Sequence, residues 1–141
     1  MISELQDSIM ALYNSDDGAT LRGLLTTPNG MFDTEAWDGT KFPYMTFSII
    51  TSSVERDTCN NYDMPIVQYS IFGDSTNGQT SAPLLEIGVE FLNLFRNTLI
   101  NPMGNEYYNF SSKLISERKI KDPDKGWQMI YEMEYQLEKI R

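Results

Sequence analysis

The sequence predicts an α+β fold in one domain, and three observations lead to this prediction. Apolar residues recur every three or four positions in residues 2–14 and again from Ala82 to about Leu99, which is typical of amphipathic helices. Segments 42–50 and 66–73 are rich in aromatic and β-branched residues, as strands are. Two alternating stretches flank Asp-Pro-Asp-Lys-Gly at 122–126, which predicts a long β-hairpin.

The two helices differ in how their ends are marked. The first ends at Asn-Ser-Asp-Asp-Gly, after which residues 19–25 can add one or two further helical turns. The second has Pro83 in its first turn, where the missing N–H costs little, and stops before Asn101-Pro102. Its expected apolar stripe comprises Leu84, Gly88, Phe91, Leu92, Phe95 and Leu99. Leu85 and Val89 are expected to widen this stripe.

Four segments in the first half of the chain are candidate strands. In residues 42–50, Pro43 lies near the start, where a strand needs no ladder hydrogen bond from it. Residues 31–37 are expected to form a short edge strand, and residues 52–58 a return strand. Segment 66–73 is apolar on both faces, with Val67, Tyr69 and Ile71 on one and Ile66 and Phe72 on the other. Because helices on one side cover one face only, we expect a subunit interface here, with Ile66, Tyr69 and Phe72 as its candidate residues.

The hairpin register follows from the alternation. Placing Asp122 opposite Trp127 brings Leu114 to Tyr135 and Ile120 to Met129 on one face. The opposite face then carries the charged side chains, and we expect it to face a channel or a neighbouring subunit. Its candidate residues are Glu132, Glu134, Glu138, Lys113 and Lys119.

The composition excludes several classes of protein. The chain has 11 basic and 20 acidic residues and a net charge of −9, which disfavours binding of DNA or anionic membranes by the whole surface. One cysteine and no histidine exclude an intrachain disulfide, Cys/His zinc sites and nucleophile–histidine pairs. No apolar run approaches the length of a membrane helix, and the N-terminus does not read as a signal peptide, so synthesis in the cytoplasm is expected.

Two pairs of acidic residues are candidate sites. Glu132 and Glu134 share a strand face about 7 Å apart, a spacing compatible with glycoside hydrolysis. Asp122 and Asp124 lie in a turn that lacks the other oxygen ligands of a calcium loop. A solvated or subunit-facing strand and a plain turn are the simpler interpretations, so we expect no catalysis, cofactor or metal. The alternative is a small cytoplasmic α+β ligand-binding domain or carboxylate-using enzyme.

The order of these segments resembles a known family. The features are Pro43-Tyr44 opening a strand, Val67-Gln68 followed by Ile71-Phe72, a helix directly after that strand containing Phe-Leu-Asn-Leu-Phe-Arg, and the final alternating strand. Over nearly the whole chain they resemble the tail-terminator proteins (also called tail-completion or minor tail proteins) of long-tailed bacteriophages and prophages. The stretch 101–126 is longer than the pattern of that family.

The resemblance implies a structural protein without catalysis. Such proteins form rings, typically hexamers, that cap the tail tube and offer a surface to the head–tail connector, with DNA only as passing cargo. It implies an antiparallel sheet with helices packed on one face, no membrane contact, and a place in the virion tail after assembly in the host cytoplasm. The subunit is expected to be able to wait as a monomer, with loops 26–42 and 51–65 ordering on docking.

Overall fold

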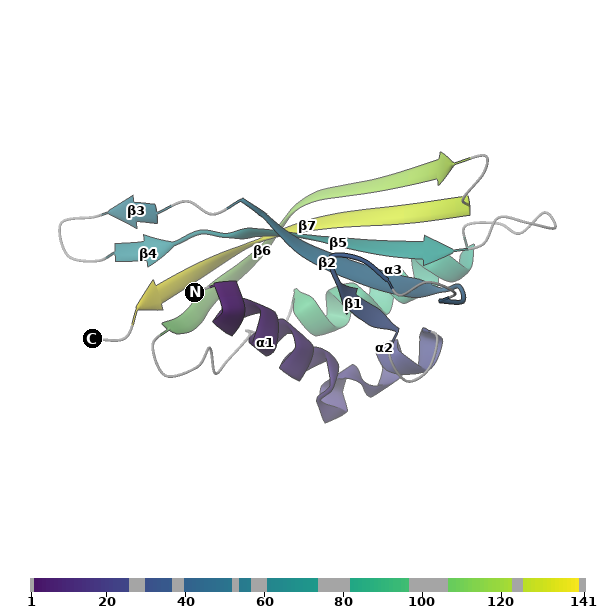
Figure 1. Ribbon diagram of the computed structural model, residues 1–141, viewed down its shortest axis with the longest axis horizontal. Helices are drawn as coiled ribbons and strands as arrows, with labels where there is room; N and C mark the ends of the chain where they lie inside the picture. The colour runs from purple at the N-terminus through teal and green to yellow at the C-terminus, as the bar shows by residue number, and fades with distance from the viewer. Residues whose placement is uncertain are drawn as a thin grey trace.

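The computed structural model describes residues 2–25, 30–36, 40–51, 54–56, 61–73, 82–96, 107–122 and 126–139. Within these residues the fold is α+β, as the sequence predicts, with the helices gathered below one twisted sheet (Figure 1). The helical elements are α1 (Ile2–Tyr13), the 3-10 turn η1 (Asp16–Gly18), α2 (Ala19–Leu24) and α3 (Ala82–Phe95). The strands are β1 (Met31–Asp33), β2 (Tyr44–Thr51), β3 (Val54–Arg56), β4 (Asn61–Asp63), β5 (Ile66–Gly73), β6 (Tyr107–Asp122) and β7 (Gly126–Lys139).

The seven described strands form a single sheet in the order β1-β2-β5-β7-β4-β3, and β6 pairs with the other side of β7. Strands β5 and β4 pair with the same side of β7, and between them the Tyr135 N–H donates to the Pro65 carbonyl at 3.0 Å. The predicted all-antiparallel sheet is wrong at one edge, because β1 runs parallel to β2. The predicted return strand is also reassigned, since β3 pairs with β4.

The predicted core face of α3 is confirmed at Leu84, Gly88, Phe91 and Phe95, but its predicted widening by Leu85 and Val89 is wrong. Leu84, Ile87, Phe91, Leu94 and Phe95 are buried, whereas Leu85 and Val89 are 45% and 57% exposed. The reason is that α2 packs beside α3, so burial spreads toward the Ile87–Leu94 flank and leaves the opposite flank open. The predicted continuation to Leu99 lies outside the described residues.

Tyr69 lies at the centre of the core. Its ring centroid is 4.7 Å from that of Phe91 and 5.1 Å from that of Phe95, and its side chain is fully buried. Its hydroxyl lies 2.6 Å from the equally buried hydroxyl of Tyr135, so each polar tip has a partner. The assignment of Tyr69 to a subunit interface is therefore wrong, because α3 covers this face of β5.

The buried tyrosines predict a loss of stability in alkali. Burial raises the pKa of Tyr131 from 10.0 to about 12, helped by the nearby Glu117 carboxylate, and burial also raises the pKa of Tyr69 and of Tyr135. These groups hold their protons more tightly in the folded state, so their contribution is complete below about pH 10 and falls as the pH rises toward about 12. Chemical denaturation between about pH 8 and about pH 12 measures this decline. Tyr131→Phe should make it shallower, and a flat profile would contradict the prediction.

The hairpin forms as predicted, but its register differs. Asp122 pairs with Gly126, which adopts a positive φ of 100°, so three residues connect the strands where four were expected. Ile120 consequently lies opposite Gln128 and is 42% exposed, and the predicted pair with Met129 is wrong. A β-bulge between Leu114 and Ser116 shifts the register again, so Leu114 pairs with Met133 and not with Tyr135, and a second bulge lies between Asn109 and Ser111.

Candidate functional site

The sheet has one face on which none of the described helices packs, and we call it the open face (Figure 1). The strand registers show which residues share this face. They include, from β2 and β5, Tyr44, Thr46, Ser48, Ile66, Gln68, Ser70 and Phe72, and, from β6 and β7, Ser111, Lys113, Ser116, Arg118, Ile120, Gln128, Ile130, Glu132, Glu134, Gln136 and Glu138. The face is mainly polar in its centre, with aromatic residues toward one end.

The structure brings Glu132, Glu134, Glu138 and Lys113 together on the open face, as predicted. Lys113 pairs directly with Glu134 in the β6–β7 register, where the sequence placed it diagonally. Each of these glutamates is partly exposed, so they lie on a hydrated surface.

Lys119 does not belong to this group. The hairpin register places it opposite Met129, on the helix side of the sheet, where its ammonium lies 5.4 Å from the centroid of the Trp127 ring. The prediction for Lys119 is therefore wrong, and the cause is the shorter turn. The residue that contacts Glu132 is Arg118, which the sequence reasoning missed because the wrong register turned it away from the glutamates.

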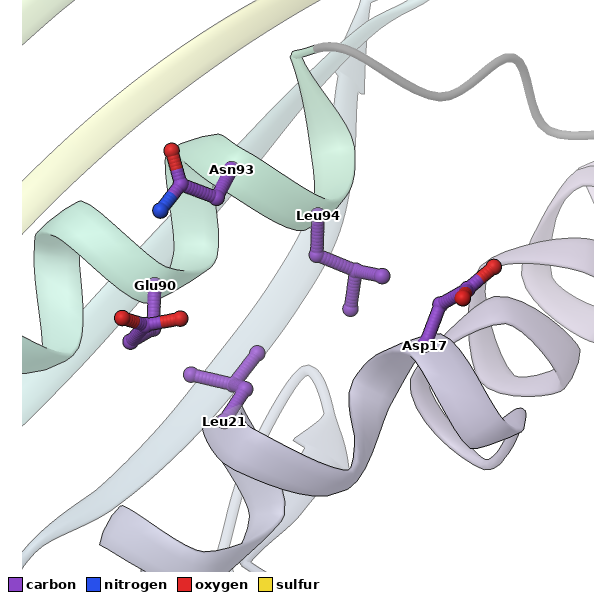
Figure 2. Close-up of a pocket in the computed structure, with 5 residues that line it drawn as sticks. All are labelled: Asp17, Leu21, Glu90, Asn93 and Leu94. Atoms are coloured by element: carbon purple, nitrogen blue, oxygen red, sulfur yellow. The ribbon is translucent and has the colours of Figure 1, made fainter.

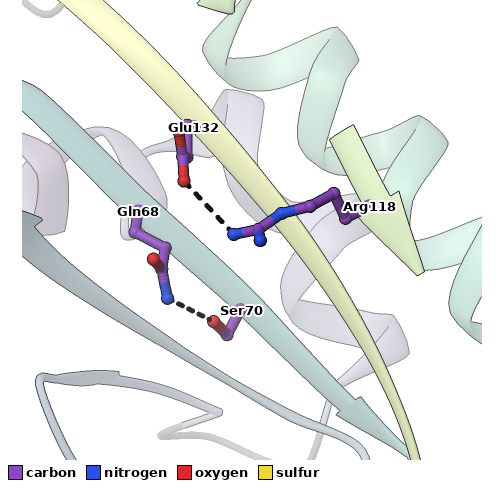
Figure 3. Close-up of polar contacts among 4 residues, drawn as sticks. All are labelled: Gln68, Ser70, Arg118 and Glu132. Carbon is purple, nitrogen blue, oxygen red and sulfur yellow. Dashed lines mark hydrogen bonds and ion pairs between the residues drawn. The ribbon is translucent and has the colours of Figure 1, made fainter. Parts of the chain in front are cut away.

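Arg118 and Glu132 form an ion pair across the two strands of the hairpin, with 3.3 Å between Nη2 and Oε1 (Figure 3). The side chains are 52% and 21% exposed, so solvent screens the pair and its contribution to stability is about 1 kcal/mol or less. Beside it, the Gln68 amide donates to the Ser70 hydroxyl at 3.4 Å. The centre of the open face thus carries two polar pairs, contributed by three strands.

Aromatic rings occupy the end of the open face near the start of β2. Tyr44 stacks on Phe72 with 5.0 Å between ring centroids and on Phe42 with 5.5 Å, and Phe32 meets Tyr44 edge-on at 6.3 Å. Phe42 is 41% exposed. Ile66 and Phe72, two of the three predicted interface residues, lie on this face and are partly exposed. Their role at an interface stays a prediction.

The two glutamates considered for glycoside hydrolysis, Glu132 and Glu134, do not line the pocket that lies beside α3. Glu132 and Glu134 stand on the strand surface with Arg118 and Lys113 as neighbours. A pocket of about 290 Å³ lies elsewhere, between α3 and the segment formed by η1 and α2, and is lined by Asp17, Leu21, Glu90, Asn93 and Leu94 (Figure 2). In the part of the chain that the structure describes, no three Asp, Glu, Cys or His residues are grouped to hold a metal.

Some sequence candidates lie beyond the structural description. Cys59, the single cysteine, and Asp124, a candidate calcium ligand, fall outside the described residues, as do residues 52–53 and 57–60 of loop 51–65. Within the described ranges, no helix has the length and apolar character needed to cross a membrane.

Comparison with known proteins adds a similarity in fold. No protein-family model matches the sequence, and no curated protein sequence matches it. The chain is similar in fold to a virion chain. That chain comes from a solved structure of the virion of a native gene transfer agent particle, with a TM-score of 0.73, and the match covers 96% of this chain and 95% of the other.

Sequence identity with the virion chain is only 9%, so the likeness concerns the fold and not the individual side chains. The coverage shows that the match includes the helices and the sheet together, and that the two chains are of nearly the same extent. The open face and the pocket must therefore be interpreted from the residues of this chain.

Proposed function

We propose that this chain is a structural virion protein, and specifically a tail terminator that forms a ring on the end of a phage tail tube and joins it to the head–tail connector. The observation that carries the proposal is the fold shared with a virion chain over nearly the full length of both proteins. The order of sequence segments, which resembles tail terminators, supports the same role.

In the proposed ring, the open face would line the channel through which DNA passes without binding. Six copies would together carry about −54, six times the net charge of −9, and a ring lined by negative charge repels phosphates. Glu138 would supply part of this lining, while Arg118 and Lys113 lie beside Glu132 and Glu134 and balance their charge. In this arrangement DNA is passing cargo, and the protein needs no cofactor and performs no catalysis.

The expected partners are the tail tube protein, the connector protein and further copies of this chain. The protein would reside in the virion tail after assembly in the bacterial host cytoplasm. The partly exposed rings of Phe42, Tyr44 and Phe72 are a suitable contact for one of these partners, because exposed apolar surface commonly marks interfaces.

Mixing the purified chain with growing tail tubes tests the proposal. We expect the tubes to stop elongating, and electron microscopy to show added density at one end, because a ring on the last tube layer blocks the next subunit. Tubes grown without the chain provide the control for length. The proposal fails if tube length is unchanged and neither the tube protein nor the connector protein retains the chain in a pull-down.

A further inference from the structure

Strand β6 forms one margin of the sheet. Among the described strands only β7 pairs with it, so its other edge has no neighbouring strand there (Figure 1). From Ser116 to Asp122 its register with β7 runs without a bulge. Alternate residues of such a strand turn their backbone N–H and C=O groups away from the sheet. Residues 116–122, which we call the β6 edge, therefore offer a regular row of hydrogen-bonding groups.

Apolar surface accompanies this row of backbone groups. Ile120 lies on the open face and is 42% exposed, and Ile115, at the bulge just before the β6 edge, is 40% exposed. An edge strand that exposes apolar side chains favours pairing with a further strand. The charges on β6 indicate which strand can be accepted.

The charge of β6 is opposite to that of the rest of the chain. The strand has four basic and two acidic residues, a net charge of +2, whereas the rest has 7 basic and 18 acidic residues and a net charge of −11. Lys119 and Lys121 are exposed on the helix side, with their ammonium groups 5.4 and 5.2 Å from the centroid of the Trp127 ring. Arg118 lies on the open face. An added strand therefore meets cations on both faces of the sheet.

These cations disfavour pairing between two copies of the β6 edge. Two such strands would bring net positive charge against net positive charge, and like charges on paired strands are destabilising. Lysines and bulges are the means by which edge strands avoid pairing with their own kind, and β6 has both. The same cations favour a strand that carries carboxylates. This agrees with the expectation that the free subunit waits as a monomer.

The alternation of side chains along β6 defines the pattern of a fitting partner. A strand added to the β6 edge turns the residues beside Lys119 and Lys121 to the helix side and the residue beside Ile120 to the open face. Aspartate or glutamate suits the first two positions, and a β-branched apolar residue suits the third. The fitting segment therefore alternates acidic and apolar residues.

We propose that the β6 edge binds an extended segment of another protein, in which acidic and β-branched apolar residues alternate, as an additional strand of the sheet. Main-chain hydrogen bonds provide the affinity, and the cations of β6 select carboxylates. The partner is another protein because the edge repels its own copy. The inference goes beyond the proposed function, since it requires neither a ring nor a tail tube.

A labelled peptide tests this proposal. The probe is a peptide of about eight residues, with both ends blocked, in which glutamate and valine alternate. Fluorescence anisotropy with the purified chain at low ionic strength should show saturable binding that weakens as salt is added. Amide hydrogen exchange in residues 116–122 should slow on binding. Lys121→Glu should weaken binding about fivefold, because it places a carboxylate beside those of the peptide.

Matched controls separate strand pairing from general attraction between charges. Lys41→Glu makes the same charge change at another exposed position and should leave binding near that of the wild type. A peptide N-methylated at every residue keeps its charge but has no backbone donors, so it should not bind. Circular dichroism establishes that both variants are folded. The proposal is overturned if the alternating peptide does not bind saturably, if the N-methylated peptide binds as well, or if Lys41→Glu weakens binding as much as Lys121→Glu.

Two further measurements examine other occupants of the β6 edge. If sedimentation velocity shows self-association of the chain and Lys121→Glu alters it, the edge takes a second copy and the proposal is wrong. If a DNA fragment binds the wild-type chain and the peptide does not, the edge contacts nucleic acid and the proposal is wrong. The peptide experiment contains no tail tubes, so its failure and the failure of tube capping are separate results.

Discussion

Replacing Tyr131 by alanine is expected to lower the free energy of unfolding by about 3–5 kcal/mol. Tyr131 is 2% exposed, and its ring centroid lies 5.1 Å from that of Phe91 on α3. Truncation removes the transfer energy of a large aromatic side chain and leaves a cavity between the sheet and α3, which neighbouring rings fill only in part. Urea denaturation of the two proteins measures the difference when the free energy of unfolding depends equally steeply on urea concentration in both.

Trp127→Ala is the matched comparison, because Trp127 lies on the same face of β7 near the hairpin turn. Its side chain is only partly buried and contacts the Lys119 and Lys121 side chains, so its truncation should cost clearly less than that of Tyr131. A loss below about 0.5 kcal/mol for Tyr131→Ala, the range of ordinary surface substitutions, would refute its position in the core.

Gly88→Ala is expected to destabilise the protein by about 1–3 kcal/mol, although alanine favours helices. A Cβ at position 88 would lie 2.1 Å from the Tyr131 hydroxyl and 3.1 Å from the ring carbon that bears it. Both residues are buried where α3 meets β7, so relief requires the helix to move away from the sheet. Thermal and chemical denaturation both report the loss.

Two further variants isolate this close approach. Tyr131→Phe removes the hydroxyl that the new methyl group would meet, so Gly88→Ala should cost less in that background. Gly23→Ala on α2 is the control, because a Cβ there meets nothing within 4 Å, and a gain of about 0.5–1 kcal/mol is expected. Equal effects of alanine at positions 23 and 88 would contradict the packing described.

Much of the fold follows from local sequence patterns. Segment 66–73 alternates around Val67, Tyr69 and Ile71, and the strand has those limits in the structure. The helix at 2–14 and the start of the helix at Ala82 are confirmed, because apolar residues recur every three or four positions over several turns in both segments. A local pattern does not show which flank of a helix another element will cover. Leu85 and Val89 were therefore expected to be buried, but they are exposed.

The hairpin shows a second limit. Alternation specifies a face only while every residue is paired, and the bulges between Leu114 and Ser116 and between Asn109 and Ser111 each reverse it. The predicted pair of Ile120 with Met129 is wrong for another reason, because the turn is one residue shorter than expected and no bulge lies between it and Ile120. The same error concealed the Arg118–Glu132 contact.

The candidate surfaces were predicted only in part. The row of Glu132, Glu134 and Glu138 is visible in the sequence because the residues lie two or four positions apart on one strand. The pocket lined by Asp17, Leu21, Glu90, Asn93 and Leu94 is not visible in the sequence, because its residues are distant in the chain and come to one place only when η1 and α2 pack beside α3. Surfaces built by tertiary packing need the structure.

The place of β7 within the sheet bears on how the chain reaches its native state. β7 pairs with β4, β5 and β6, all of which precede it in the chain, so most long-range pairing depends on a segment that the ribosome makes after its partners. Until then, one edge of β5 has no neighbouring strand, beside the apolar side chains Val67 and Ile71. Exposed edges of this kind recruit other chains. Folding should therefore be slow and late, and chaperones that shield nascent chains become relevant to how much assembly-competent protein a cell can supply.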